Sequence, residues 1–215
     1  MARVLTLGKG LPPGRVAEVA AVLRDHGVVA LPTESFYALG ASPTDQAAVR
    51  RVIAIKGREE GKPILVLVGD RTQAESLAGE IGAAARLLME RFWPGPLTVI
   101  VKAASGLPVE LTAGTGTVGL RHVGHPVLAD LLRSLGPLTG TSANRSGEPP
   151  ARSAQEVAAC LGGEVDLILD GGTTAGGAPS TLVDTVNGLR LLREGAVPRA
   201  RIAAILREAG YPSPS

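Results

Sequence analysis

The spacing of apolar runs along the chain limits the fold more than any other feature of the sequence. In the first half, short runs at residues 28–32 and 64–68 alternate with an amphipathic helical pattern at residues 45–56. Near the end, the runs at 181–186 and 189–192 lie too close together for a helical crossover between parallel neighbours. The sequence therefore predicts an α/β fold, in which a mixed parallel and antiparallel sheet is flanked by helices.

Further patterns complete this prediction. Strands are expected at residues 97–101, 117–121 and 167–169, and helices at 81–92, 128–135, 153–161 and 202–209. The 28 glycines are scattered over many turns, and no segment has the composition of a linker. We therefore expect a single domain over residues 1–207, followed by a short C-terminal tail, residues 208–215, whose last residues, YPSPS, resemble a frayed end.

Composition excludes several classes of protein. No apolar run approaches the length of about 18 residues needed to cross a membrane, so a cytoplasmic protein without membrane contact is expected. Aromatic residues make up only 2% of the chain, which disfavours a single-strand nucleic-acid binder built on stacking platforms. The net charge of +2 permits contact with nucleotides or RNA without requiring it.

The common catalytic and nucleotide-binding signatures are absent. The sequence contains neither G-x-x-x-x-G-K-[ST] nor a G-x-G-x-x-G that follows a strand. It also lacks H-E-x-x-H and G-x-S-x-G, and its single cysteine has no partner for a zinc site. Neither a catalytic side chain nor a metal ligand can therefore be assigned.

Polar residues cluster where the expected strands end, which is where ligands commonly bind in α/β sheets. The segment 32–40 directly follows a buried strand, and by itself favours a turn in which Thr33 or Ser35 caps a helix. Lys56 extends the core-facing stripe of the helix 45–56. Either its stem snorkels at the helix C-terminus, or its ammonium is aimed into a cleft beside Arg58 and Lys62 to bind phosphate.

Three later clusters have similar properties. Arg121 ends an apolar strand, where a guanidinium needs either an internal carboxylate or an anionic ligand. The loop 140–150, which contains Ser142, suits an anion-binding nest as well as an ordinary turn. Arg193 closes another apolar strand.

The order and spacing of these clusters resemble the threonylcarbamoyl-AMP synthase family. That family carries P-T-[DE]-T-V-Y-G-L-G, a K-x-R pair, W-P-G-P-L-T, a strand ending in Arg, an S-x-N loop, S-T and L-R-x-G. The corresponding segments here are PTESFYALG, Lys56 with Arg58, WPGPLT at 93–98, Arg121, Ser142 with Asn144, Ser180 with Thr181, and LREG. The resemblance covers residues 28–197.

The resemblance implies a fold and a reaction. The fold is an open twisted mixed sheet with helices around a large basic cavity. In the reaction, the amine of L-threonine takes up bicarbonate and the carbamate attacks the α-phosphate of ATP, giving threonylcarbamoyl-adenylate and pyrophosphate. A threonylcarbamoyl-transferase complex then passes the group to tRNA, which is a further expected partner, and Mg²⁺ is expected to arrive with ATP.

The resemblance also implies roles for individual residues. Thr33, Arg121, Gly140 and Ser180 would bind threonine. The ATP-binding set would comprise Lys56, Arg58, Lys62, Thr117, Ser142, Asn144 and Arg193. These side chains suit their roles, because a guanidinium fork pairs with a carboxylate and cations neutralise phosphates.

Two departures and two alternatives accompany the resemblance. Ser35-Phe36 stands where Thr-Val is usual and Ala38 where Gly is usual, and the Phe36 change bears on the amino-acid pocket rather than on nucleotide binding. One alternative is an RNA-binding or ribosome-maturation paralogue of the same fold without synthase activity. The other is a carbamoyl-transfer module of hydrogenase maturation proteins, whose zinc-binding segments have no match here.

Overall fold

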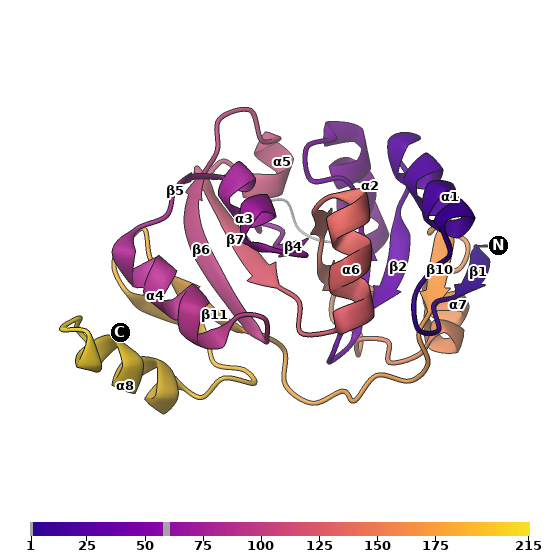
Figure 1. Ribbon diagram of the computed structural model, residues 1–215. Helices are drawn as coiled ribbons and strands as arrows, with labels where there is room; N and C mark the ends of the chain where they lie inside the picture. The colour runs from indigo at the N-terminus through magenta and orange to yellow at the C-terminus, as the bar shows by residue number, and fades with distance from the viewer. Residues whose placement is uncertain (1, 58–60) are drawn as a thin grey trace.

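The computed structural model describes residues 2–57 and 61–215, and it contains two sheets that lie side by side with helices around them (Figure 1). In the first sheet the strand order is β1 (Arg3–Thr6), β10 (Leu167–Asp170), β2 (Val29–Pro32), β3 (Tyr37–Gly40) and β9 (Thr141–Ser142). β1, β10 and β2 are parallel, whereas β3 is antiparallel to both of its neighbours.

The second sheet is also mixed. Its order is β12 (Arg190–Arg193), β11 (Thr181–Asp184), β6 (Leu97–Ala103), β7 (Thr117–His122), β4 (Val66–Val68) and β8 (Leu138–Thr139), with β5 (Ala78–Glu80) paired to β6. β11 runs parallel to β6 and β4 runs parallel to β7, while the β6–β7 and β11–β12 pairs are antiparallel. The predicted α/β fold with a mixed sheet is therefore confirmed.

The two sheets are joined where β8 passes into β9. Only Gly140 separates these strands, although β8 belongs to one sheet and β9 to the other. Next to it, the buried Thr139 hydroxyl donates to the Leu39 carbonyl at 2.9 Å and accepts from the Ala41 amide at 2.9 Å. This pair of hydrogen bonds attaches the end of β8 to β3 in the other sheet.

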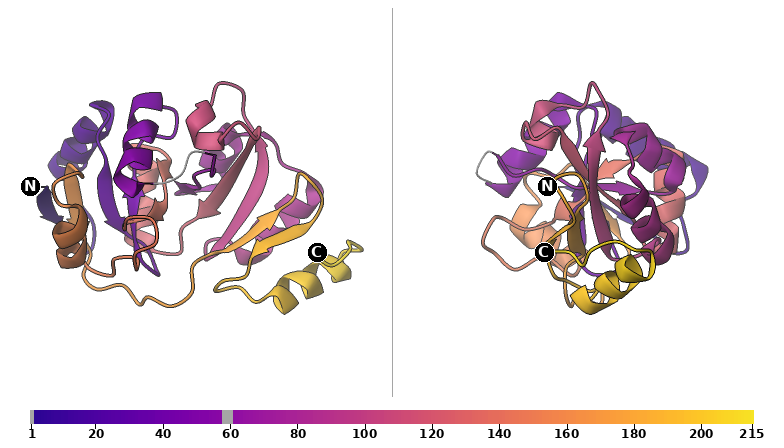
Figure 2. Two further views of the ribbon diagram at one scale, coloured as in Figure 1. Left: turned by 180° about the vertical axis from the view of Figure 1, so that it is seen from behind. Right: turned by 90° about the vertical axis from the view of Figure 1, so that its left-hand side faces the viewer.

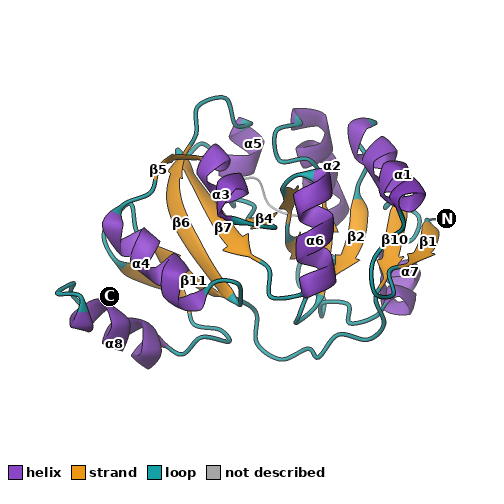
Figure 3. Ribbon diagram, viewed as in Figure 1, coloured by secondary structure: helices purple, strands orange, loops and turns teal. Residues whose placement is uncertain are grey.

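The described part of the chain contains eight helices, which lie around the two sheets (Figure 3). They are α1 (Pro13–Arg24), α2 (Gln46–Lys56), α3 (Arg71–Leu77), α4 (Ala83–Phe92), α5 (Val109–Thr112), α6 (Pro126–Leu135), α7 (Ala154–Leu161) and α8 (Arg199–Glu208). Asp45 and Ser153 cap α2 and α7 through their side chains, because Asp45 accepts from two backbone amides of the first turn and Ser153 from one. Within residues 2–57 and 61–215, none of the helices has the length and apolar character needed to span a membrane.

Alternating side chains on the first sheet pack against two different sets of helices. On β2, Val29 and Leu31 join the hydrophobic cluster that contains residues of α1 and α6. Ala30 instead belongs to a larger cluster with residues of α2 and α7, and this cluster extends to β6 and β7 of the second sheet. The shared core supports the proposal that the chain folds as one domain.

Some elements depart from the sequence-based expectations. The end of the chain, expected to be loose, contacts the β12 segment: the Ser215 amide donates to the Leu189 carbonyl at 3.1 Å, and the Ser215 carbonyl accepts from the Leu191 amide at 2.9 Å. The segment 32–40 contains no helix, because its second half forms β3. Seen from behind, residues 171–180 run as an extended segment along one side of the molecule, from β10 to β11 (Figure 2).

Candidate functional site

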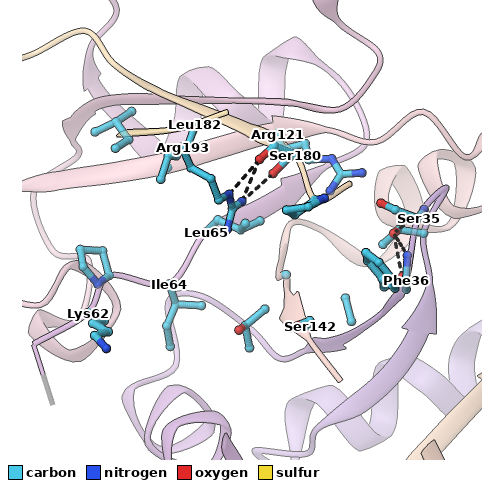
Figure 4. Close-up of a pocket in the computed structure, with 18 of the residues that line it drawn as sticks. Ser35, Phe36, Lys62, Ile64, Leu65, Arg121, Ser142, Ser180, Leu182 and Arg193 are labelled. Atoms are coloured by element: carbon cyan, nitrogen blue, oxygen red, sulfur yellow. Dashed lines mark hydrogen bonds between the residues drawn. The ribbon is translucent and has the colours of Figure 1, made fainter. Parts of the chain in front are cut away.

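A cavity of about 370 Å³ lies between the two sheets, and its walls come from segments far apart in the sequence (Figure 4). The turn after β2, the segment that precedes β4, strands β6 and β7, the β8–β9 junction, β11 and β12 all contribute. Eight of the residues selected from the sequence line it: Thr33, Lys62, Thr117, Arg121, Gly140, Ser142, Ser180 and Arg193.

Among the described residues, the charged side chains that line this cavity are all cations. Lys62, Arg121 and Arg193 contribute to its wall, and no aspartate or glutamate lines it among the residues the structure describes. Hydroxyl groups of Thr117, Ser142 and other residues supply hydrogen-bonding capacity beside these cations. Such a lining favours a ligand that carries negative charge.

Arg121 is the most deeply buried of these cations, with only 6% of its side chain exposed. Its Nη2 forms an ion pair with Glu34, which follows Thr33 in the turn after β2. Nevertheless, Nε and Nη2 make no hydrogen bond to any described residue. Because this guanidinium is a buried charge in the cavity wall, it is suited to binding an anionic ligand there.

Arg193 is held against Ser180 at the end of β12 (Figure 4). Its Nε and Nη2 donate to the Ser180 carbonyl at 3.1 and 2.9 Å, and Nη2 also reaches the Ser180 hydroxyl at 3.2 Å. Burial, and then repulsion by the charge of Arg121, lower the pKa of Arg193. An anion bound between the two guanidinium groups would relieve that repulsion.

Lys56 is buried beside the cavity rather than in its wall. Its Nζ donates to the Ser142 carbonyl at 2.7 Å and to Asn144 Oδ1 at 3.0 Å. Only 5% of Lys56 is exposed, so the ammonium does not snorkel into solvent. Lys56 and Asn144 therefore hold the loop from which Ser142 faces the cavity.

The turn after β2 is fixed by Thr33. Its hydroxyl donates to the Phe36 carbonyl at 2.7 Å and accepts from the amides of Ser35 and Phe36, both at 3.3 Å. The helix-capping interpretation of this segment is thus wrong, since these bonds close a hairpin between β2 and β3. The hairpin presents Thr33, Ser35 and Phe36 to the cavity.

Gly140 approaches its neighbours too closely for any side chain. A Cβ atom built on it would lie 2.4 Å from Leu67 Cγ and 2.7 Å from Leu65 Cδ1. Its amide donates to the Leu65 carbonyl at 2.9 Å and is therefore already engaged. Of the remaining predicted residues, Arg58 lies outside the part of the chain that the structure describes.

Sequence reasoning missed two parts of the site. Glu34, the partner of Arg121, could have been selected, because it occupies the [DE] position of the P-T-[DE] segment. The apolar wall formed by Ile100, Leu182 and Leu192 gave no signal, since these residues have the pattern of ordinary strand side chains. No group of three or more histidine, cysteine, aspartate or glutamate side chains suited to a metal ion occurs within residues 2–57 and 61–215.

Comparison with known proteins adds independent information. The family model of Sua5, YciO and YrdC proteins, described as telomere recombination, matches residues 21–195. A *Bacillus subtilis* protein named threonylcarbamoyl-AMP synthase is 39% identical over 195 residues, which cover 89% of this chain and 56% of that protein. One of the same name from *Thiobacillus denitrificans* is 41% identical over 186 residues, or 86% of this chain and 96% of that protein.

Solved structures give a consistent result. *Pyrococcus abyssi* Sua5 complexed with L-threonine has a TM-score of 0.85 and 34% identity, over 96% of this chain and 60% of that one. *E. coli* YciO has a TM-score of 0.79 and 29% identity, over 91% of this chain and 97% of that one. The chain spans 56% and 62% of the length of the *B. subtilis* and *P. abyssi* synthases that it matches.

Proposed function

The chain belongs to the family of Sua5, YciO and YrdC proteins, and we propose that it synthesises threonylcarbamoyl-adenylate from L-threonine, bicarbonate and ATP. The observation that carries this proposal is the cavity between the sheets, whose described lining includes Lys62, Arg121 and Arg193 and no carboxylate. Both proposed organic substrates carry negatively charged groups, a carboxylate on threonine and phosphates on ATP.

Threonine binds with its carboxylate against Arg121. The guanidinium of Arg121 is buried in the wall of the cavity, and a carboxylate is the partner that such a group binds most strongly. Ser180 and the Gly140 carbonyl lie in the same wall and offer partners for the amino end, while Thr33 holds the hairpin that closes this side. The complex of *P. abyssi* Sua5 with L-threonine supports an amino-acid site in this fold.

ATP occupies the part of the cavity near Lys62, Ser142 and Arg193. The two cations neutralise phosphate charge, and hydroxyl groups such as those of Ser142 and Thr117 supply hydrogen bonds. Lys56 and Asn144 act on ATP by holding the Ser142 loop, and Arg58 is proposed to join this set because of its place in the K-x-R pair. The apolar wall of Ile100, Leu182 and Leu192 suits the base.

The chemistry follows from holding these substrates together. The threonine nitrogen forms a bond to the carbon of bicarbonate and water is lost, giving a carbamate. A carbamate oxygen then attacks the α-phosphorus, and the bond to the pyrophosphate oxygen breaks. The site offers no carboxylate or histidine in its described lining to act as base, so positioning and cationic stabilisation supply the catalysis expected of a nucleotidyltransferase.

Mg²⁺ is proposed to enter with ATP. Because the described residues provide no cluster of metal-ligating side chains, the ion would be held mainly by phosphate oxygens and water. In that position it would neutralise charge on the phosphates.

The product is proposed to serve tRNA modification in the cytoplasm. A mixed anhydride of this kind needs an acceptor, and a threonylcarbamoyl-transferase complex would pass the group to adenosine in tRNA. The paralogue that binds RNA without making the adenylate is disfavoured, because relatives at 39% and 41% identity carry the name threonylcarbamoyl-AMP synthase.

Incubation of the purified protein with ATP, Mg²⁺, bicarbonate and labelled threonine tests this proposal. Pyrophosphate and threonylcarbamoyl-adenylate should appear in equal amounts and only when threonine is present. Arg121→Gln should raise the KM for threonine about tenfold or more, because a charged hydrogen bond to the carboxylate is lost. Arg86→Gln, which alters an exposed arginine paired with Glu75, should leave it unchanged. Folded wild-type protein that releases no threonine-dependent pyrophosphate would refute the proposal.

A further inference from the structure

Glu34 lies next to Arg121 but does not line the cavity. It comes from the hairpin turn between β2 and β3, whereas Arg121 comes from β7 in the other sheet. Its Oε1 pairs with Arg121 Nη2 and also accepts from the Gly124 amide at 3.4 Å, in the loop between β7 and α6. The Glu34 carboxylate thus connects the hairpin to both ends of the segment 121–124.

The atoms left without hydrogen bonds around this ion pair match one another. Among the described residues, they are Glu34 Oε2 on one side and Arg121 Nε and Nη2 on the other, and all three atoms are buried. A carboxylate pairs side-on with a guanidinium through Nε and Nη2, one oxygen to each nitrogen. That pairing would satisfy the three atoms together and would leave Nη1 as the remaining nitrogen of Arg121.

We infer that Glu34 is a positioning residue for the amino-acid carboxylate: it holds one edge of the Arg121 guanidinium, so that the rest of the group is fixed for the substrate. This inference rests on the proposed function of the same site. A guanidinium on a long side chain has many rotamers, and binding would otherwise have to order it. Glu34 orders Arg121 before the substrate arrives and sets the preference for a free carboxylate.

The opposite role for Glu34 has a distinct consequence. If its carboxylate occupied the place of the substrate carboxylate, threonine would have to displace it, and removing the charge would strengthen threonine binding. If Glu34 positions Arg121 from behind, removing the charge weakens threonine binding instead. The sign of the change therefore separates the two roles.

Calorimetric titration of the full chain with L-threonine, and separately with ATP, tests the inference. Glu34→Gln should raise the Kd for threonine about tenfold or more, because an ionic hydrogen bond that orders Arg121 is lost. The Kd for ATP should change by less than about twofold. Glu34→Asp should recover part of the threonine affinity. L-threoninamide, which lacks the carboxylate charge, should bind wild type and Glu34→Gln equally weakly.

Controls separate this inference from general damage and from the proposed function. Glu18→Gln, which neutralises a glutamate paired with Arg3 and Arg15 on α1, should change neither Kd. Unchanged or tighter threonine binding by Glu34→Gln would overturn the inference, even if the wild type makes the adenylate. Conversely, Glu34-dependent threonine binding by a wild type that makes no adenylate would refute the proposed function and leave the inference standing.

Discussion

Of the three buried charged side chains in the described part of the chain, two lie at or beside the cavity. Lys56 and Arg121 are each only 5% exposed, a rare degree of burial for cations. Both have specific partners: Lys56 donates to the Ser142 carbonyl, and Arg121 forms an ion pair with Glu34. These two cations thus order the groups that face the ligand. The free-energy cost of burying their charges is offset by hydrogen bonds and ion pairing.

Lys56→Met should weaken ATP binding about tenfold, because the loop that carries Ser142 loses its charged donor. Titration calorimetry with ATP would measure the change, and circular dichroism would verify that the variant is folded. Lys102→Met, which alters an exposed lysine near Glu80, is the matched control. Equal ATP affinity in the wild type and the Lys56 variant would contradict the role given to Lys56.

His122 gives the folded state a pH dependence. Burial lowers the pKa of His122 below its ordinary value of 6.5, so the unfolded chain binds the proton more readily. The stabilising contribution of neutral His122 is therefore present above pH 6.5 and is lost as pH falls from there towards the folded-state pKa. His122→Asn should show a smaller drop in Tm between about pH 7.5 and about pH 5.5 than the wild type. Identical drops would exclude this contribution.

Among the elements, the β8–β9 junction has the strictest steric requirement. Gly140→Ala should lower the free energy of unfolding by about 1–3 kcal/mol, because its Cβ would overlap Leu65 and Leu67. Denaturant unfolding measures this loss. Gly163→Ala, at a site with open space around the new Cβ and no positive φ, is the control and should have little effect. Equal stability of the two variants would show that the junction can relax.

The elements also show what the sequence can and cannot predict. Buried strands and capped helices were predictable because their residues repeat with the period of the element, as in α2 and α7. β3 was missed, since Thr33 and Ser35 read as turn or cap residues and Tyr37–Gly40 follows them without a break. β8 and β9 are two residues each, too short for any periodicity.

The candidate site, too, was predictable from the sequence only in part. Its cations and hydroxyl groups were predictable from the motifs at strand ends, and seven of them line one cavity together with Gly140. The apolar wall was not predictable, because Ile100, Leu182 and Leu192 meet only through the pairing order of β6, β11 and β12. The position of Lys56 beside the cavity rather than in it also depends on tertiary structure.

At the scale of the whole molecule, the ligands are expected to bridge the two sheets. The cavity is lined by β3 from one sheet and by β6, β7, β11 and β12 from the other. A ligand that binds only this folded arrangement stabilises it, by about 2.7 kcal/mol at a concentration of 100 times its Kd. ATP and threonine together should therefore raise Tm further than either alone. A rise in Tm that is no larger with both ligands, each at saturating concentration, than with one of them alone would contradict a shared site.

A crystal structure of the chain with L-threonine and a non-hydrolysable ATP analogue tests the central claim most directly. The account predicts both ligands in the cavity between the sheets, with the threonine carboxylate on Arg121 and the phosphates near Lys62 and Arg193. Ligands bound elsewhere, or a threonine carboxylate that does not contact Arg121, would contradict it.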